Sequence, residues 1–112
     1  MKDQLSPQKC SKYLRALADP ERLRIVQCLE EGPLPVGELC KRIHSPLANV
    51  SHHLKQLRIA GLVVGRKQGR SVIYALSTRV LEQNKTESSL NVLDFGCCRL
   101  ELGQRIPQPD AV

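Results

Sequence analysis

The chain lacks any apolar run long enough to cross a bilayer, which takes about 20 residues in a helix. Its start, Met1 to Lys12, is polar and has no apolar segment of the kind that signal peptides carry. We therefore expect a cytoplasmic protein with no membrane partner. At 112 residues the chain has room for one small domain, and such domains often gain stability by dimerising.

Acidic residues are missing from the middle of the chain. Between Lys41 and Val80 there is no Asp or Glu, while eight basic residues occur there: Lys41, Arg42, Lys55, Arg58, Arg66, Lys67, Arg70 and Arg79. From Leu81 to Val112 the balance reverses, with three basic residues against five acidic ones. A basic surface without carboxylates predicts contact with a polyanion, and the alternative is an ordinary solvated face.

The residues that catalysis requires are also missing. The sequence has no recognisable set of nucleophile, base and acid, and no glycine-rich loop that would cradle a phosphate. We therefore predict that the protein is not an enzyme.

The cysteine count is odd. In a reducing compartment, five cysteines argue against a framework of structural disulfides and leave packing, metal binding and redox chemistry open. They are Cys10, Cys28, Cys40, Cys97 and Cys98.

Prolines and capping residues mark the starts of the predicted helices. The first is expected from Pro7 to Ala18, with an apolar stripe formed by Cys10, Tyr13, Leu14 and Leu17. Asp19-Pro20-Glu21 predicts the start of the second, and Gly32-Pro33 its end. Pro35 opens a short third helix, which buries Val36, Leu39, Cys40 and Ile43.

A fourth helix is expected to begin with Ser45 as its cap and Pro46 as its first residue, and to reach about Ala60 before Gly61 ends it. Its buried stripe is Val50, Leu54 and Leu57. Because only a few residues separate it from the third helix, the pair predicts a helix-turn-helix.

After Gly61 the apolar pattern changes from helical to alternating. Leu62–Lys67 and Ser71–Leu76 predict two strands, and Gln68-Gly69-Arg70 predicts a tight turn between them. The predicted fold is mainly α with a small β-hairpin. It is a winged helix-turn-helix of four helices and two strands, followed by a C-terminal helix or strand.

The C-terminal third is expected to contain a short helix and a strand. A short helix is predicted from Arg79 to about Lys85, then alternating apolar residues whose register shifts at Gly96 as in a strand with a bulge. We divide the chain into a winged helix-turn-helix domain over residues 1–80, a C-terminal segment over 81–103 and a disordered tail over 104–112.

His52 and His53 are adjacent on the fourth helix and are expected to differ in role. Neighbouring helical side chains point about 100° apart, whereas histidine pairs that bind metal usually sit four residues apart. We predict that His52 faces outward, while His53 packs near the buried side and bonds to the backbone.

The outward face of the fourth helix and the hairpin predict a DNA-binding surface. The helix would place hydroxyl, amide and imidazole groups against base edges in the major groove, and the hairpin would hold phosphates. The residues predicted to contact DNA are Leu47, Ala48, Asn49, Ser51, His52, Lys55, Arg66, Lys67 and Arg70. For His52, the alternative is an ordinary exposed side chain.

Two stretches carry a family resemblance. LADPERLRIVQCLEEGPLPVGELCKRI, followed by VSHHLKQLRIAGLVVGRKQGRSVIYALS, resembles the ArsR/SmtB family of bacterial winged-helix repressors over about Leu17 to Ser77. The resemblance implies a homodimer built on the first and last helices, which binds an imperfect palindrome in double-stranded DNA until an inducer loosens the complex. Residues 1–80 would then be the DNA-binding and dimerisation domain, and 81–103 a dimerisation or sensor segment. It places the positions of Leu47, Ala48, Ser51 and His52 in the major groove. Because Leu47 and Ala48 replace residues that are often polar in relatives, Asn49 or contacts with thymine methyl groups are expected to contribute to base reading.

The resemblance also indicates where an inducer would bind. Metal-sensing relatives carry E-L-C-x-C, but here Arg42 replaces the second cysteine, and no histidine follows His53 to form a zinc site. Some arsenical-responding members have a vicinal cysteine pair near the C-terminus, like Cys97 and Cys98, and Cys10 would be a third ligand. Redox-responding members pair a cysteine of the second helix with a C-terminal one, a role that Cys28 would take.

The vicinal pair has two readings. Adjacent cysteines rarely form a relaxed disulfide with each other, so binding As(III) or another thiophilic metal ion, or pairing elsewhere in the chain, is the functional one. Packing on opposite faces of a half-buried strand is the structural one.

The leading hypothesis is a homodimeric DNA-binding repressor, with or without a thiol switch. The rival functions are a winged-helix module that binds another protein and a small thiol-redox or metal-carrier protein.

Overall fold

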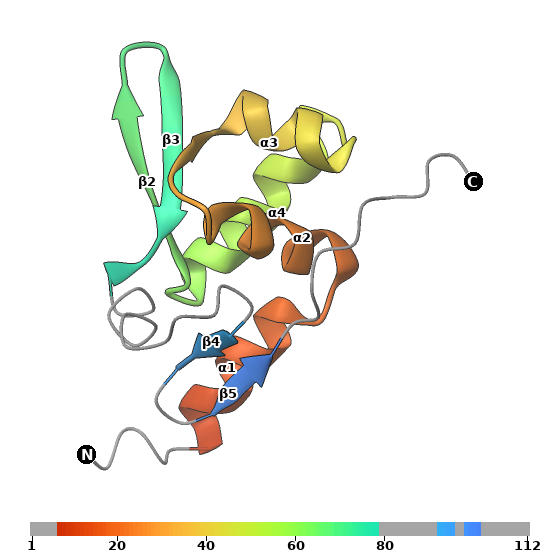
Figure 1. Ribbon diagram of the computed structural model, residues 1–112, viewed down its shortest axis with the longest axis vertical. Helices are drawn as coiled ribbons and strands as arrows, with labels where there is room; N and C mark the ends of the chain where they lie inside the picture. The colour runs from red at the N-terminus through yellow and green to blue at the C-terminus, as the bar shows by residue number, and fades with distance from the viewer. Residues whose placement is uncertain (1–6, 79–91, 96–97, 102–112) are drawn as a thin grey trace.

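The computed structural model describes residues 7–78, 92–95 and 98–101. The elements in chain order are α1 (Pro7–Leu17), α2 (Pro20–Leu29), β1 (Leu34–Pro35), α3 (Val36–Ile43), α4 (Leu47–Ile59), β2 (Val63–Gln68), β3 (Ser71–Leu76), β4 (Val92–Asp94) and β5 (Arg99–Glu101). All four predicted helices and the predicted hairpin are present (Figure 1). The helix expected from Arg79 to Lys85 and the tail 104–112 lie outside the described residues.

The α1–α2 corner is held by a side-chain cap. Asp19 precedes α2, and its Oδ1 accepts hydrogen bonds from the backbone N–H groups of Glu21 at 2.9 Å and Arg22 at 3.2 Å. These are amides that a helix start otherwise leaves unbonded. The predicted cap is therefore confirmed.

The predicted apolar stripe of α1 is wrong at one position. Tyr13, Ala16 and Leu17 are buried, but the Leu14 side chain is 45% exposed. The buried face of α1 is thus centred on the side of Tyr13 and Leu17, and Leu14 lies outside it.

The turn between α3 and α4 is sharp. His44 ends α3 in the left-handed conformation, with φ 53° and ψ 52°, and its backbone N–H bonds to the carbonyl of Cys40. The predicted capping role of Ser45 is wrong, because Pro46 occupies the cap position of α4 and no side chain bonds there. The Ser45 hydroxyl instead donates to Glu21 Oε1 at 3.2 Å.

The end of α4 matches the expected glycine stop. Gly61 has φ +86°, a conformation that residues with a Cβ rarely adopt. Its N–H bonds to the carbonyl of Arg58 at 2.9 Å, and the N–H of Leu62 bonds to that of Leu57 at 2.9 Å. This pair of bonds is a Schellman motif, which turns the chain directly from α4 into β2.

The wing is an antiparallel sheet in the order β1-β3-β2. In the β2–β3 hairpin Val63 pairs with Leu76 and Gln68 with Ser71, which leaves Gly69 and Arg70 as the turn. Gly69 has φ +64°, as a tight hairpin turn requires at this position. The third strand, β1, was not predicted. Its Leu34 pairs with Tyr74.

The C-terminal segment forms a hairpin rather than one strand with a shifted register. Leu93 of β4 pairs with Leu100 of β5, and the backbone N–H of Phe95 bonds to the carbonyl of Cys98 at 2.9 Å. The hairpin packs on α1, where the rings of Phe95 and Tyr13 have centroids 5.0 Å apart (Figure 1). The chain therefore reverses direction where the sequence suggested a bulge.

A single aliphatic core joins these elements. Its fully buried side chains include Ile25 from α2, Leu39 from α3, Leu54 from α4 and Leu93 from β4. Because α4 is anchored on this core, its opposite side is left to solvent. Among residues 7–78, 92–95 and 98–101, no helix is long and apolar enough to span a membrane.

Candidate nucleic-acid interface

The outward face of α4 carries the predicted base-reading residues. Val50, Leu54 and Leu57 are at most 1% exposed, so they fix which side of the helix faces the core. All six residues predicted to contact DNA from this helix are exposed: Leu47, Ala48, Asn49, Ser51, His52 and Lys55. The apolar side chain of Leu47, at the start of the helix, is 58% exposed.

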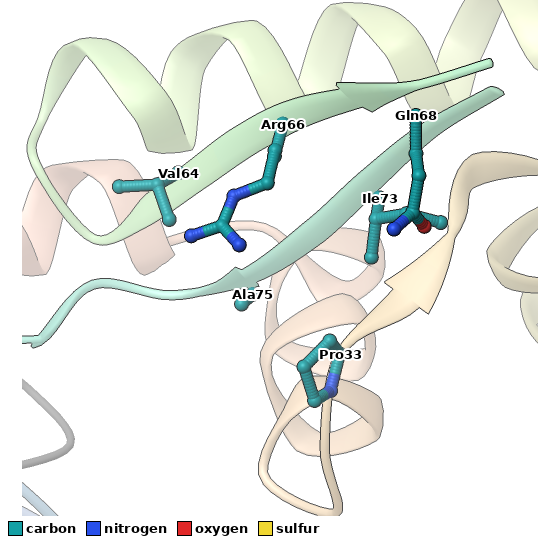
Figure 2. A pocket seen from close by; sticks show the side chains of 6 residues that line it. All are labelled: Pro33, Val64, Arg66, Gln68, Ile73 and Ala75. Atoms are coloured by element: carbon teal, nitrogen blue, oxygen red, sulfur yellow. The ribbon is translucent and has the colours of Figure 1, made fainter. Parts of the chain in front are cut away.

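The wing presents its cations on both of its faces. Arg66 and Lys67 are both exposed neighbours in β2, so their side chains leave the sheet on opposite sides. Arg66 lies with Val64 and Ile73 along a shallow groove of about 290 Å³, which Figure 2 shows. Arg70 is exposed in the hairpin turn.

Most of the basic residues predicted to face a polyanion are not neutralised by an ion pair within the described part of the chain. No carboxylate among the described residues forms an ion pair with Lys55, Arg58, Arg66, Lys67 or Arg70. Arg42 differs, because it contacts Glu38 at 3.2 Å and Glu31 at 3.5 Å. The hydrogen bond with Glu38 raises the pKa of the Arg42 guanidinium. Glu31 and Glu38 lie before the acid-free stretch in the sequence, but the fold brings them to Arg42. Arg42 is therefore already paired and is not a free cation for a polyanion. Arg79 lies outside the described residues.

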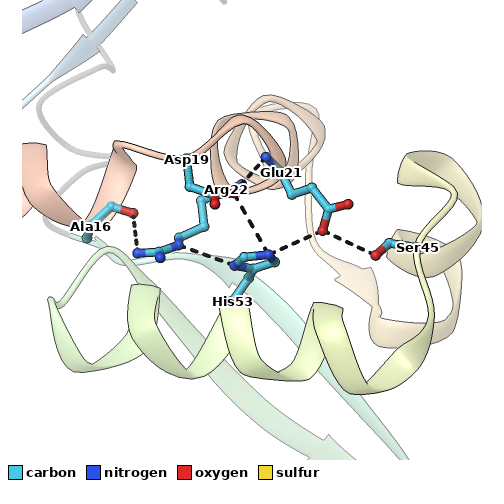
Figure 3. Close-up of polar contacts among 6 residues, drawn as sticks. All are labelled: Ala16, Asp19, Glu21, Arg22, Ser45 and His53. Carbon is cyan, nitrogen blue, oxygen red and sulfur yellow. Dashed lines mark hydrogen bonds and ion pairs between the residues drawn. The ribbon is translucent and has the colours of Figure 1, made fainter.

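His53 is the centre of a polar network between α4 and the start of α2 (Figure 3). Arg22 Nε donates to His53 Nδ1 at 3.3 Å, and His53 Nε2 lies 3.2 Å from Glu21 Oε1 and 3.8 Å from Asp19 Oδ1. An arginine has donors only, so His53 Nδ1 must accept and Nε2 must carry the proton. The His53 side chain, which is 14% exposed, thus donates to Glu21.

The network connects four segments of the chain. Arg22 Nη1 donates to the backbone carbonyl of Ala16 in α1 at 3.1 Å, and Ser45 in the α3–α4 turn donates to Glu21 (Figure 3). The start of α2 is therefore bonded to α1, to the turn and to α4. This arrangement sets the position of α4 relative to the rest of the domain.

The sequence prediction for His53 was right about its packing and wrong about its partners. His53 bonds to side chains, not to the backbone, and Arg22 and Glu21 were not recognised as members of the site. Arg22 is 31 residues away along the chain, so no local pattern pairs it with His53. Only the Asp19-Pro20 start signal pointed to part of the network.

The pKa of Asp19 reflects its place in this network. Partial desolvation raises it, but the backbone N–H groups of Arg22 and Glu21 and the nearby His53 and Arg22 side chains lower it more. The net pKa lies below the usual aspartate value. Asp19 is therefore a charged cap that also faces His53.

The cysteines are distributed over different environments. Cys28 is buried in the core and Cys40 is partly buried against it, and neither forms a disulfide. Cys98 is half-buried and also outside any disulfide. Cys10, on α1, is disulfide-bonded, so its sulfur is oxidised and is not a thiolate ligand in this structure. Cys97 lies outside the described residues.

A metal site is not formed by the part of the chain that the structure describes. No group of three or more His, Cys, Asp or Glu side chains is arranged there to hold an ion. The rings of His52 and His53 have centroids 5.8 Å apart and are tilted by 58°. The thiolate site predicted at Cys97 and Cys98 includes a residue outside the described ones and stays a prediction.

Comparisons with known proteins agree with this geometry. Residues 17–66 match a helix-turn-helix domain family. The arsenical resistance operon repressor of Staphylococcus xylosus is 33% identical over 94 residues, which cover 83% of this chain and 90% of the repressor. The chain belongs to the ArsR/SmtB family of winged helix-turn-helix regulators.

Two further proteins are similar to a large part of this chain. The HTH-type transcriptional regulator NmtR of Mycobacterium tuberculosis is 45% identical over 74 residues, which cover 66% of this chain and 62% of NmtR. The chain thus spans less than two thirds of that relative. The solved structure of HlyU from Vibrio cholerae superposes with a TM-score of 0.62 at 32% identity, covering 73% of this chain and 95% of HlyU.

Proposed function

We propose that this protein is a DNA-binding transcriptional repressor that acts as a homodimer and catalyses no reaction. The observation that carries the proposal is the combination of an exposed α4 face with wing cations that no described carboxylate neutralises. Side chains of Ser51, His52 and Asn49 read base edges in the major groove, while Arg66 or Lys67 and Arg70 hold backbone phosphates. The names of the relatives, which are repressors and regulators, support the same function.

The exposed apolar residues fit this geometry. Leu47 is exposed at the N-terminal end of α4, where a recognition helix meets the bases. An aliphatic side chain at this position contacts thymine methyl groups and forms no hydrogen bond. Its exposure supports the expectation that part of the base reading is apolar.

Dimerisation through α1 is supported by Leu14. This side chain is 45% exposed on the helix that also carries the C-terminal hairpin, and a second copy of the chain would cover it. A two-fold dimer presents two copies of α4, and the matching DNA site is then an imperfect palindrome.

An inducer site at Cys97 and Cys98 is the finer part of the proposal. The ligand is As(III) or another thiophilic metal ion, or an oxidant that pairs two thiols. Cys10, on α1, is disulfide-bonded, which supports the oxidant form of the switch, because metal binding needs a thiolate. The inducer acts only if it binds the DNA-free dimer more tightly than the DNA-bound dimer, so it must contact a part that differs between them.

Salt-dependent DNA binding tests the main proposal. Affinity for a labelled duplex from upstream of the protein's own gene is measured by anisotropy at several salt concentrations. We expect a steep loss of affinity with salt, and Arg70→Ala should reduce the slope by about 1 per protomer. Arg24→Ala, an exposed arginine of α2, is the control of equal charge. Salt-insensitive binding to a protein partner, without duplex binding, would indicate the protein-interaction alternative.

The inducer is tested in the same assay. The duplex complex of the reduced protein is treated with As(III), Zn(II), Cu(I) or a mild oxidant. A Cys97→Ser/Cys98→Ser variant should bind DNA normally and no longer release it on treatment. Release from this variant at the wild-type inducer concentration would remove the two cysteines from the switch.

A further inference from the structure

A second basic site lies beside the C-terminal half of α4. It is a shallow pocket of about 210 Å³ between α1, α2 and α4. Its lining residues are Lys12, Arg15, Ala16, Arg22, Gln56, Ile59 and Ala60. None of the residues predicted to contact DNA lines it.

The pocket is positively charged. Three of its lining residues are cations and none is acidic. Lys12 and Arg15 are exposed, and no described carboxylate forms an ion pair with either of them. Asp19 and Glu21 belong to the polar network of Arg22 and do not line the pocket.

Arg22 is held in place before any ligand arrives. Its Nε bonds to His53 and its Nη1 to the carbonyl of Ala16 (Figure 3). A guanidinium has five N–H donors, so donors remain after these two bonds. A fixed guanidinium loses less conformational entropy on binding an anion than a mobile one does.

The pocket is continuous with the proposed reading face. Ile59 follows His52 by seven residues and Lys55 by four, which places the three side chains on one face of α4. Ile59 is 61% exposed at the mouth of the pocket. A duplex lying along the exposed face of α4 therefore passes the pocket.

The proposed dimer contact leaves the pocket open. Leu14 is two residues from Lys12, which on a helix is a rotation of about 200°. The exposed apolar side of α1 and the pocket side of α1 therefore point in different directions. A second copy seated on Leu14 would not cover Lys12.

We propose that this pocket binds a backbone phosphate of the duplex, so that α1 adds a third contact to those of α4 and the wing. The inference rests on the proposed DNA binding. Lys12 and Arg15 supply charge, Arg22 supplies fixed donors, and Ile59 contacts the adjoining sugar or base. A phosphodiester fits this set better than an apolar ligand, because the site is open and has three cations around a small volume.

The test compares Lys12→Ala/Arg15→Ala with Arg24→Ala in the salt titration. Lys12→Ala and Arg15→Ala are also measured singly, because Arg24→Ala removes one exposed charge and the double variant removes two. Arg24 is two residues from Arg22 and therefore lies on a different flank of α2. One lost phosphate contact per protomer should lower the slope of log affinity against log salt by about 0.9, or about 1.8 per dimer. At 0.1 M salt each lost contact corresponds to about an eightfold loss of affinity. Arg24→Ala should leave the slope unchanged, and thermal melting should show all variants folded.

Three results would decide against the inference. If Lys12→Ala/Arg15→Ala keeps the wild-type slope while Arg70→Ala lowers it, the proposed function stands and the pocket contact is wrong. If Arg24→Ala lowers the slope equally, the effect is one of general charge.

In a second arm, inorganic phosphate is titrated at constant ionic strength. Saturable binding that the double variant abolishes, with an unchanged duplex slope, would assign the pocket to a free phosphate ester. Wild-type protein without salt-dependent duplex binding would instead reject the proposed function itself.

Discussion

Replacing Asp19 with alanine removes the cap of α2 and one partner of His53 together. Caps of this kind contribute about 0.5–2 kcal/mol, and Asp19 accepts two backbone hydrogen bonds, at 2.9 and 3.2 Å. The contact with His53 is longer, at 3.8 Å, and partly solvated, so it adds at most a few tenths of a kcal/mol, on the order of an exposed pair. We expect Asp19→Ala to lower the free energy of unfolding by about 1–2 kcal/mol at pH 7.

Asp19→Asn separates the cap from the charge. Asparagine caps helices about as well as aspartate, so this variant should keep the hydrogen bonds and lose only the charge at the helix start, about 0.3–1 kcal/mol. Urea denaturation at pH 7 measures both variants. In a domain of this size each kcal/mol lowers Tm by about 4–8 °C.

The pH dependence gives the sign of the charge contribution. Because the pKa of Asp19 is lower in the folded than in the unfolded chain, its charge stabilises the fold above the unfolded value of about 3.9. That stability is lost as the pH falls through the folded pKa. The difference between wild type and Asp19→Asn should therefore shrink from pH 5 to pH 3. A difference that grows towards acid, or Asp19→Ala within about 0.3 kcal/mol of wild type, would refute the reasoning.

Three further substitutions test separate parts of the structure. Gly65→Ala would place a Cβ 2.8 Å from Cε1 of the half-buried Tyr74. We expect it to lower the free energy of unfolding by about 1–3 kcal/mol in urea denaturation. An unchanged midpoint would contradict the packing of the wing. Arg42→Ala should leave the urea midpoint close to that of wild type and the salt slope of DNA binding unchanged, because its charge is already paired with Glu38 and Glu31 on the surface. A reduced slope would make Arg42 a phosphate contact. His52→Ala should weaken binding to the specific duplex by about tenfold and leave binding to unrelated DNA unchanged; equal losses on both duplexes would remove it from base reading.

Features set by neighbouring residues could be read from the sequence. The cap at Asp19, the stop at Gly61 and the turn at Gly69 each involve bonds or dihedrals within a few residues, and all three predictions are confirmed. The exposed face of α4 was also predictable, because Val50, Leu54 and Leu57 fix the buried side. These local signals were sufficient for the winged helix-turn-helix.

Features that depend on distant partners could not be read in this way. Ser45 has the pattern of a cap, but Glu21, 24 residues earlier, lies close enough to take its hydroxyl. The strand β1 contains a proline and only two residues, and it exists because β3 offers an open edge. Arg42 lies in an acid-free stretch, yet the fold places Glu31 beside it. In each case the type of interaction could be predicted from the residue, but its partner is determined by the tertiary fold.

The position of Arg22 suggests how events at α1 would reach the DNA. Its guanidinium bonds to His53 of α4 and to the carbonyl of Ala16 in α1, and it lines the proposed phosphate pocket. The same α1 carries the disulfide-bonded Cys10 and the exposed Leu14. A ligand or oxidant that shifts α1 relative to α4 must therefore either break the Arg22 bonds or move the pocket away from the reading face. On the proposed function, moving the pocket away from the reading face would weaken the DNA-bound arrangement more than the free one, and such a difference in affinity is the coupling that an inducible repressor requires.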